Sequence, residues 1–409
     1  MFPTRYDIDC RDYAGRLFDR ISLGTALSSK SASYHYATFE YCQLKIRVAS
    51  QDQRDLIWLR EFLRPSFREK REGSSDWNVR VLSDWEKHKD LLSRGAHDSE
   101  KYLDCFLLDS RMVRLPLWKS GTNEKIVFDQ AFKVFYGVRR KENEAVILAP
   151  TNRPWQRRIP LMRVVRELAM NHSVESGGIT IHGSALRVDG TGILIAGPKG
   201  AGKTTLLIHM LRQTSAEYIS NDRVVVFVRN GRPVMQGMPT IVTANESTLK
   251  MFGSLEERLT SSFYNPCLSL KESRSRLLGT ISLDDKGQYN LSPAQFREFL
   301  DVGATRKSKL EVLLFPRITN GNGGIRLKPL TFGKAAQRLR SSFFRAHSPC
   351  KISNVFTSSL TESSETEKEL EKFSDLIIKV VRCYDCFLGK KAYSGPDLTE
   401  SLTAGGVCL

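Results

Sequence analysis

The sequence predicts an α/β fold in which a P-loop core is preceded by a small α+β domain. A glycine-rich loop at 197–204 stands between an apolar run typical of a strand and an apolar run typical of a helix. Within 105–150, short segments rich in Val, Ile and Phe alternate with polar residues, as antiparallel strands do. The length of 409 residues allows two or three domains and an ample core.

Residues 1–154 are predicted to form the α+β domain, whose role the sequence does not indicate. The alternating pattern predicts strands within 34–48, 126–128, 131–138 and 145–149. Apolar spacing predicts helices over 54–63 and 81–92.

Residues 155–345 are predicted to form the nucleotide-binding domain. A helix is expected over 159–172, followed by two strands at 179–188 and 192–196. Asp189-Gly190 between these strands is a signal for a tight hairpin. Two strands joined by a tight turn before a phosphate loop are unusual for a P-loop protein of the common parallel type.

Further elements are expected after the P-loop helix. The sequence predicts strands at 217–220, 224–228, 310–315 and 325–327, a turn at 321–324 and a helix over 333–344. The segment 230–308 contains several prolines and is expected to be rich in loops. Residues 346–409 are expected to be a C-terminal extension, with a polar loop or helix entry at 357–369 and a closing helix and strand within 372–388.

The glycine-rich loop has the residues that phosphate binding requires. Its glycines let backbone N–H groups point inward, and the helix that follows adds its positive end. Lys203 is predicted to reach the β- and γ-phosphates and Thr204 to bind Mg²⁺. The alternative is a glycine-rich turn before a helix, and Lys199 either adds charge to the site or faces solvent. The predicted nucleotide-binding residues are Gly197, Pro198, Lys199, Gly200, Ala201, Gly202, Lys203, Thr204 and Thr205.

Two further residues are candidates for the same site. Asp222 stands at the edge of an apolar strand, where P-loop enzymes place a carboxylate that directs Mg²⁺, so Thr204 and Asp222 are the predicted metal ligands. The alternative for Asp222 is a strand-end acid paired with Arg223. His182 lies on an apolar strand one hairpin before the loop, and the alternatives are a core histidine and a residue of the site.

The order of His182-Gly183, hairpin, glycine-rich loop and Asn221-Asp222-Arg223 resembles the HPr kinase/phosphorylase superfamily, whose P-loop core is shared with ATP-dependent phosphoenolpyruvate carboxykinases. The resemblance covers 155–230 and extends weakly through 310–344. It implies that Asp222 matches a metal-directing aspartate and that His182 lies beside the γ-phosphate. Asn221 stands where the family has its general base, and the segment 238–242 lacks the acid of the family's second signature.

The residues and the resemblance together lead to three functional hypotheses. The first is an ATP- and Mg²⁺-dependent kinase that phosphorylates a hydroxyl of a small molecule, peptide or protein, with His182, Lys203 and Asp222 as catalytic residues. The second is a non-catalytic regulator that binds ATP, which the loss of the first aspartate favours. The third is an NTPase that acts with nucleic acid, which only the charge favours.

Composition and charge limit the binding partners and the cellular compartment that we expect for this protein. The formal net charge of +17 attracts anions, but no nucleic-acid-binding motif accompanies it, so solvated basic faces are the preferred interpretation. Lys271, Arg274 and Arg276 are either an anion clamp or a solvated loop. Cys383 and Cys386 are interpreted as part of a strand rather than a zinc or redox site. No apolar run is long enough to span a membrane, so a cytoplasmic protein is expected, and the resemblance allows a homo-oligomer.

Overall fold

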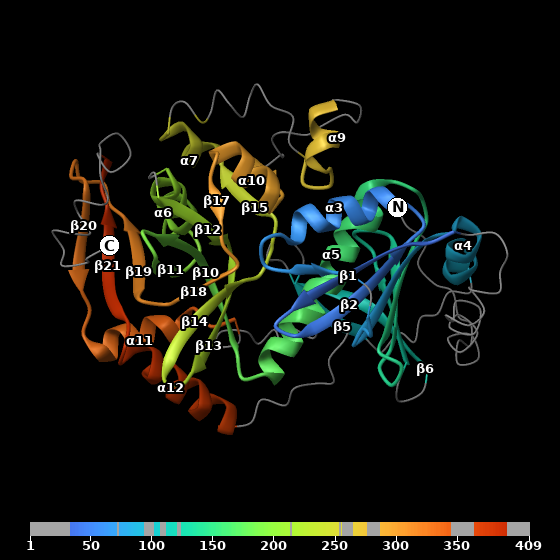
Figure 1. Ribbon diagram of the computed structural model, residues 1–409, viewed down its shortest axis with the longest axis horizontal. Helices are drawn as coiled ribbons and strands as arrows, with labels where there is room; N and C mark the ends of the chain where they lie inside the picture. The colour runs from blue at the N-terminus through green and yellow to red at the C-terminus, as the bar shows by residue number, and fades with distance from the viewer. Residues whose placement is uncertain are drawn as a thin grey trace. The chain divides into compact units, whose positions relative to one another are not determined.

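The chain divides into two compact units, which are described separately (Figure 1). The computed structural model describes residues 33–71, 73–93, 102–106, 112–120, 124–212, 215–252, 255, 265–275, 287–344 and 364–390. Of the described residues, those within 33–60 and 68–171 belong to the first unit, and those within 61–67, 172–344 and 364–390 to the second. The division falls inside a helix, later than the predicted boundary at 154/155. Residues 364–390 are part of the second unit and do not form a separate extension.

The first unit contains one mixed sheet. Its strands are β1 (His35–Tyr41), β2 (Leu44–Ser50), β3 (Arg68–Lys70), β4 (Trp77–Ser83), β5 (Tyr102–Phe106), β6 (Met112–Ser120), β7 (Glu124–Asp129), β8 (Val134–Arg139) and β9 (Glu144–Ala149). They lie in the order β3-β1-β2-β4-β9-β8-β7-β6-β5, with β2, β4 and β9 parallel and the other pairs antiparallel. The predicted meander over β7, β8 and β9 is therefore confirmed.

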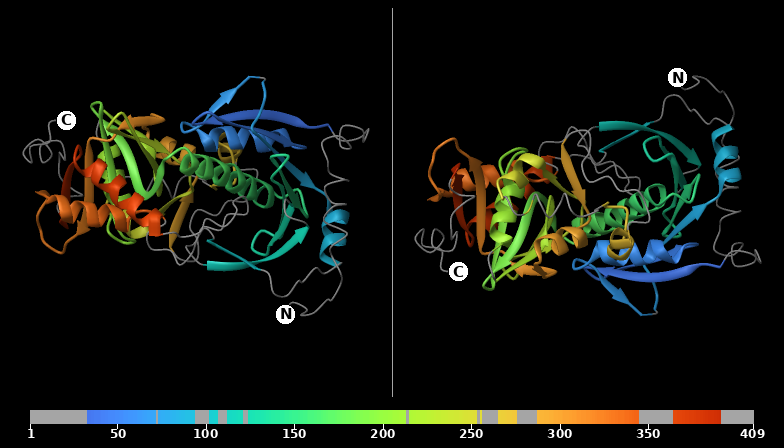
Figure 2. Two further views of the ribbon diagram at one scale, coloured as in Figure 1. Left: turned by 90° about the horizontal axis from the view of Figure 1, so that it is seen from below. Right: turned by 90° about the horizontal axis from the view of Figure 1, so that it is seen from above.

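Three helices accompany this sheet: α3 (Gln53–Leu63), α4 (Trp85–Ser93) and α5 (Pro154–Glu175). The sheet curves around α5, as both views of Figure 2 show. Leu161, Val164 and Val165 on this helix are buried, as the helical spacing predicted.

The predicted helix over 81–92 is wrong in its first turn. Residues 81–83 form the end of β4, which lies between β2 and β9 and buries Val79 and Val81. Pairing on both sides outweighs the helical spacing of the sequence here. The backbone N–H of Lys87 donates to Asp84 Oδ1 at 3.0 Å, so Asp84 caps α4 and the helix begins only after it.

The second unit contains a larger mixed sheet. Its strands are β10 (Ile179–Val188), β11 (Thr191–Ala196), β12 (Ala216–Ser220), β13 (Arg223–Arg229), β14 (Arg232–Gly237), β17 (Gly303–Ala304), β18 (Lys307–Lys309), β19 (Val312–Ile318), β20 (Ile325–Pro329) and β21 (Arg382–Leu388). The path runs β18-β14-β13-β10-β11-β19-β21-β20, with β12 also paired to β10 and β17. β11, β19 and β21 are parallel, while β10 is antiparallel to β11.

Helices cover both faces of this sheet. Ile193 and Ile195 of β11 share a buried cluster with α6 (Lys203–Leu211) and α10 (Pro293–Leu300). Leu194, on the opposite face, belongs to a second cluster with α11 (Phe332–Ser341) and α12 (Ser364–Ile378). The alternation of a strand thus sends neighbouring apolar residues into two cores, and the unit has three layers.

The segment 230–308 has more regular structure than the prolines predicted. Besides β14, β17, β18 and α10 it contains β15 (Val242–Asn245), α7 (Glu246–Lys250), α9 (Leu270–Ser275) and β16 (Gln288–Leu291). Pro293 occupies the first turn of α10, after Ser292, which forms a capping box with Gln295. A proline at this position favours the start of a helix. From the sequence it was interpreted as a sign of a loop.

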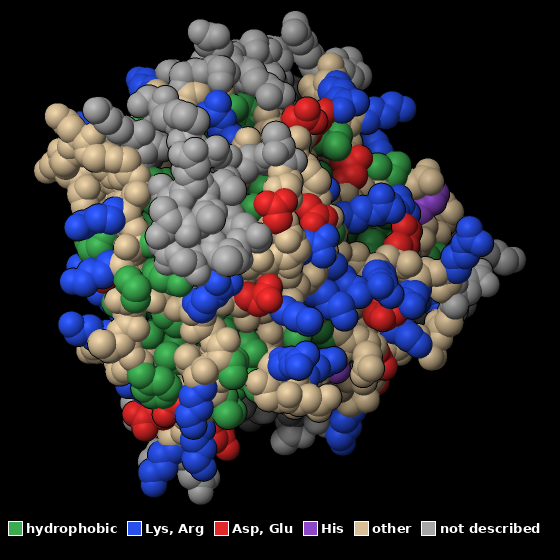
Figure 3. All heavy atoms as spheres, turned by 60° about the vertical axis from the view of Figure 1, so that its left-hand side comes forward, with side chains coloured by type: hydrophobic (Ala, Val, Ile, Leu, Met, Phe, Trp, Pro, Cys, Tyr) green, Lys and Arg blue, Asp and Glu red, His purple; other side chains and the backbone are tan. Residues whose placement is uncertain are grey.

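The basic character of the chain is visible on its surface. Figure 3 shows Lys and Arg side chains spread across one face, with Asp and Glu side chains among them. Among the described residues, no helix combines the length and the apolar character needed to cross a bilayer.

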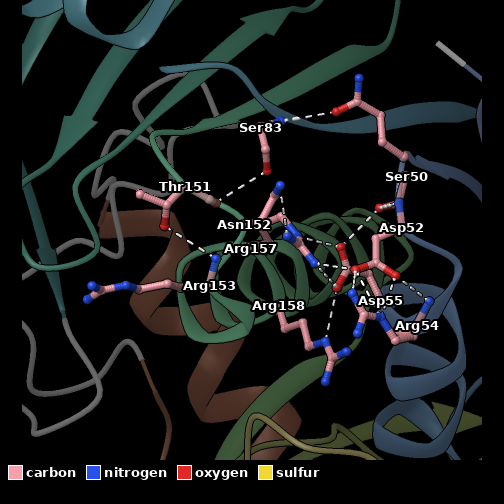
Figure 4. A network of polar contacts seen from close by, with 11 residues as sticks. Ser50, Asp52, Arg54, Asp55, Ser83, Thr151, Asn152, Arg153, Arg157 and Arg158 are labelled. Atoms are coloured by element: carbon pink, nitrogen blue, oxygen red, sulfur yellow. Dashed lines mark hydrogen bonds and ion pairs between the residues drawn. The ribbon is translucent and has the colours of Figure 1, made fainter.

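A buried ionic network lies inside the first unit (Figure 4). The Asp55 carboxylate is fully buried and accepts hydrogen bonds from Arg157 at 2.8 and 3.1 Å, from Arg158 at 3.0 Å and from Ser50 at 3.0 Å. Arg157 also contacts Asp52 at 2.8 Å. One carboxylate thereby joins α3 to the start of α5, and its charge offsets those of two buried guanidinium groups.

Asp55→Ala should destabilise the first unit by about 3–5 kcal/mol, because it leaves Arg157 and Arg158 buried without this carboxylate. Glu69→Ala is the matched control, since Glu69 pairs with Arg60 at the partly exposed surface and should cost at most about 1 kcal/mol. Urea denaturation of both variants measures the difference. Equal costs would contradict a structural role for the Asp55 network.

Candidate active site

The glycine-rich loop links β11 to α6 in the predicted strand–loop–helix order. Gly197, Gly200 and Gly202 have φ angles of 149°, 81° and 100°, which other residues rarely adopt. A Cβ on Gly202 would also lie 3.0 Å from Ile318 Cγ1. Glycine is therefore required here both by the backbone conformation and by the close approach of β19.

The N-terminal end of α6 is open to an anion. Its N-cap residue is Gly202, and no side chain caps the helix. The first N–H groups of a helix have no partner inside it and carry a partial positive charge. Loop and helix together have the backbone arrangement of an anion nest, which is what the predicted phosphate site requires.

Lys203 lies over the loop. Its Nζ donates hydrogen bonds to the carbonyl oxygens of Gly197 at 2.8 Å and Pro198 at 2.9 Å. Burial lowers the pKa of Lys203, and the negative charge of Asp222 partly offsets this. The ammonium group is thus held in the loop and interacts electrostatically with Asp222.

The neighbouring loop residues differ in burial. Thr204 is half-buried, whereas Thr205 is buried with its Oγ1 3.5 Å from Thr248 Oγ1. Lys199 is exposed, which agrees with the solvent-facing alternative. Of these two threonines, Thr204 is thus the less buried, and its metal role stays a prediction.

Asp222 sits in a strained turn. Its φ is 71°, and the N–H of Arg223 donates to the carbonyl oxygen of Asn221 at 2.9 Å. A three-residue turn with a positive φ at its centre is rare and strained. Such conformations persist where surrounding contacts hold them, and they cluster at functional sites.

Several hydrogen bonds hold this turn. Asn221 Oδ1 accepts from the Ser184 hydroxyl at 2.9 Å, and the Asn221 carbonyl accepts from the Thr240 hydroxyl at 2.8 Å. The Gly183 N–H donates to the Asp222 carbonyl at 3.1 Å. Ser184 and Thr240 were not predicted, because their contacts cross 37 and 19 residues of chain. Asn221, the residue in the position of the family's base, is buried and engaged with Ser184.

His182 is partly exposed and does not have the burial of a core histidine. Its Nε2 lies 3.2 Å from Asp222 Oδ1, and the side chains of both residues are about 40% exposed, at 39% and 41%. The His182 N–H donates to the Ser342 carbonyl at 2.8 Å. Phe344 packs edge-on to the His182 ring and beneath the Arg223 guanidinium, whose Cζ is 4.4 Å from the ring centroid. The structure thus brings His182 and Asp222 into contact, with Lys203 within electrostatic range of Asp222.

The candidate metal ligands, Thr204 and Asp222, are enough for Mg²⁺ only if phosphate oxygens also bind the ion. No group of three or more His, Cys, Asp or Glu side chains arranged for a metal occurs in the described part of the chain. Mg²⁺ often takes only one or two protein oxygens and completes its shell with phosphate and water. Thr204, which is half-buried, and Asp222, whose side chain is 41% exposed, carry oxygens of the kind that such a site uses.

The structure tests the prediction for the two cysteines of β21 but not the prediction for the basic cluster at 271–276. Cys383 and Cys386 lie in β21, where burial raises the pKa of each thiol to about 12, so the strand interpretation is confirmed. Arg274 on α9 pairs with Glu298 on α10 and is largely exposed, Lys271 is exposed, and Arg276 lies outside the described residues. An anion clamp at these residues stays a prediction.

No family model matches the sequence, and no curated protein matches it. A solved structure that does match is the HPr(Ser) kinase/phosphatase from Coxiella burnetii, at 10% identity, over 56% of this chain and 92% of that chain, with a TM-score of 0.21. A TM-score this low does not establish a shared fold. The structure defines a mixed α/β protein in which a glycine-rich loop joins β11 to α6.

Gly202→Ala should abolish the phosphate nest, because the loop requires a φ of 100° and close contact with β19. Gly231→Ala is the matched control, since Gly231 has a φ of 71° but no neighbour within 4 Å of the added Cβ. Gly231→Ala should cost about 1–2 kcal/mol of stability, and Gly202→Ala more, because its Cβ also approaches Ile318. Only Gly202→Ala should weaken ATP binding, measured by isothermal titration calorimetry. Equal affinities in the two variants would argue against the nest.

Proposed function

We propose that this protein is an ATP- and Mg²⁺-dependent kinase that transfers the γ-phosphoryl group to a hydroxyl of a small molecule, peptide or protein. The observation that carries the proposal is the convergence of Lys203, Asp222 and His182 at the open end of α6. A phosphate nest alone supports nucleotide binding. A carboxylate–imidazole pair beside it supplies what transfer to a hydroxyl requires.

The chain's own residues have distinct roles in this reaction. The loop N–H groups and Lys203 bind the phosphate oxygens and stabilise the charge that develops on them. Lys203 must leave the Gly197 and Pro198 carbonyls to do so. The acceptor oxygen forms a bond to the γ-phosphorus while the bond from that phosphorus to the bridging oxygen of ADP breaks. The hydroxyl proton passes to the His182–Asp222 pair.

The metal would be held by Thr204 and Asp222. When bound, Mg²⁺ would neutralise negative charge on the phosphate groups. The strained turn at residue 222 fixes where the carboxylate projects, because neighbouring backbone and side-chain groups hold Asn221 and Asp222. A prepositioned carboxylate lowers the entropic cost of assembling the site.

A second function has one observation in its favour. Asn221 is buried and bonded to Ser184, so the position that resembles the family's base holds no carboxylate. A regulator that binds ATP without transferring phosphate would need only the nest and the metal site. The difference between the two functions is therefore the fate of the γ-phosphate.

Lys203→Ala and Asp222→Ala should each abolish transfer of label from γ-labelled ATP to an acceptor in a cell extract or metabolite pool. The loss follows because one variant lacks the cation at the phosphates and the other the carboxylate of the turn. Arg187→Gln is the control, since Arg187 pairs with Glu217 away from the loop. Tight ATP binding by the wild type with no transfer and no phosphate release would instead support the regulator.

Asp222→Asn and His182→Ala should separate the two members of the pair. Asp222→Asn should raise the Mg²⁺ concentration needed for half-maximal activity, because it removes a charged oxygen ligand. His182→Ala should lower kcat by about 10²–10⁴ while leaving the Mg²⁺ requirement unchanged, as expected for loss of a proton acceptor. A raised Mg²⁺ requirement in His182→Ala alone would reverse these assignments.

A further inference from the structure

A second charged cluster lies on the same sheet as the P-loop and has no part in the proposed transfer. It consists of Arg317 on β19, Arg338 on α11 and Asp385 on β21. Arg338 Nη1 and Arg317 Nε both contact Asp385 Oδ1, the latter at 3.4 Å. The side chain of Asp385 is only 9% exposed, whereas that of Arg317 is 54% exposed. One buried carboxylate oxygen thus holds two guanidinium groups, one of which reaches solvent.

The surroundings add further positive charge. Lys328 on β20 is the cross-strand partner of Asp385, and Arg326 is that of Phe387, with its Cζ 4.8 Å from the Phe387 ring centroid. Directly opposed residues share a face of the sheet. Four cations and one carboxylate on this face leave three positive charges in excess.

The cluster lies at the same sheet edge as the P-loop. β19 runs parallel to β11, with Ile195 opposite Leu314, so Arg317 is level with the first residues of the loop. Its two neighbours approach the loop glycines. A Cβ on Gly197 would lie 4.0 Å from Pro316, and one on Gly202 would lie 3.0 Å from Ile318. Arg317 points to the opposite face from these two side chains, toward α11.

Helix α11 connects the cluster to the His182–Asp222 pair. Arg338 lies one turn before Ser342, whose carbonyl accepts the hydrogen bond from the His182 N–H. One helical turn advances about 5.4 Å along the axis. Helix α11 thus contacts the cluster through Arg338 and the backbone of His182 through Ser342, which makes the acceptor the candidate occupant of the cluster.

Two guanidinium groups held this close repel each other. Burial lowers the pKa of Arg338, and the positive charge of Arg317 lowers it further. A second anion would relieve this repulsion. Because Asp385 meets both guanidinium groups through one oxygen, their remaining N–H groups can take up the paired oxygens of a carboxylate or phosphate.

We propose that Arg317 and Arg338, positioned by Asp385, bind an oxyanion group of the acceptor, so that the acceptor is a hydroxyl compound that also carries a carboxylate or a phosphate. The identification of the bound molecule as the acceptor rests on the proposed function. The oxyanion site itself depends only on the cluster, which allows the two proposals to fail separately.

The test uses the full chain, saturated with MgADP so that the P-loop is occupied. Inorganic phosphate and, separately, acetate are titrated into the wild type and into Arg317→Gln, Arg317→Gln/Arg338→Gln and Arg187→Gln variants, with calorimetric detection. Arg317→Gln keeps the buried Arg338–Asp385 contact and should fold normally, and thermal unfolding and MgADP affinity check this. Lys203→Ala without MgADP is included as a separate arm.

At least one of the two anions should bind the wild type and the Arg187→Gln control equally. Arg317→Gln should weaken its binding about tenfold and the double variant more, as expected for lost charge-assisted hydrogen bonds, while MgADP affinity changes less than twofold. Preference for phosphate or for acetate then indicates the oxyanion of the acceptor. The inference is overturned if neither anion binds, or if Arg317→Gln leaves anion binding unchanged. It is also overturned if MgADP affinity falls together with anion affinity. Anion binding that persists in Lys203→Ala would support the cluster even if the kinase proposal fails.

Discussion

The change of partner in the middle of β10 is the constraint on which the site depends. On one edge β10 pairs with β11, while on the other edge 179–182 pair with β13 and 185–188 pair with β12. Gly183 and Ser184 therefore lie between two pairings, opposite the turn that joins β12 to β13. Their N–H and hydroxyl groups hold Asp222 and Asn221. The strained turn is fixed by the strand that also carries His182.

The same strand sets the distance to the phosphate loop. Gly183 pairs with Ala196, the last residue before the loop. A Cβ on Gly183 would lie 2.7 Å from the Ile195 carbonyl oxygen, so a larger residue would push β10 from β11. Close backbone approach thus places the His182–Asp222 pair within electrostatic reach of Lys203, whose pKa responds to the Asp222 charge. The same backbone contact therefore packs β10 against β11 and sets the position of the candidate site residues.

The helices behind the sheet complete the arrangement. α11 packs on the face opposite α6 and ends where its Ser342 carbonyl binds the His182 N–H. Its Arg338 also meets Asp385 on β21. One helix therefore links the candidate phosphoryl-transfer residues to the basic cluster, and the parallel strands β11, β19 and β21 bring both to one sheet edge.

By itself, the sequence determined the features that depend on near neighbours in the chain. Local conformational preference and apolar spacing predict the loop glycines, the Asp189-Gly190 turn, the strand around Cys383 and most helices. The structure has all of these. Val81 to Ser83 and the segment around Pro293 were misread, because strand pairing and helix capping outweighed the local pattern. Only the tertiary structure decided that Ser184 and Thr240 hold Asn221, and that Arg317, Arg338 and Asp385 meet. These contacts form between residues 19 to 68 positions apart, and strand order and register, which one sequence does not reveal, bring them together.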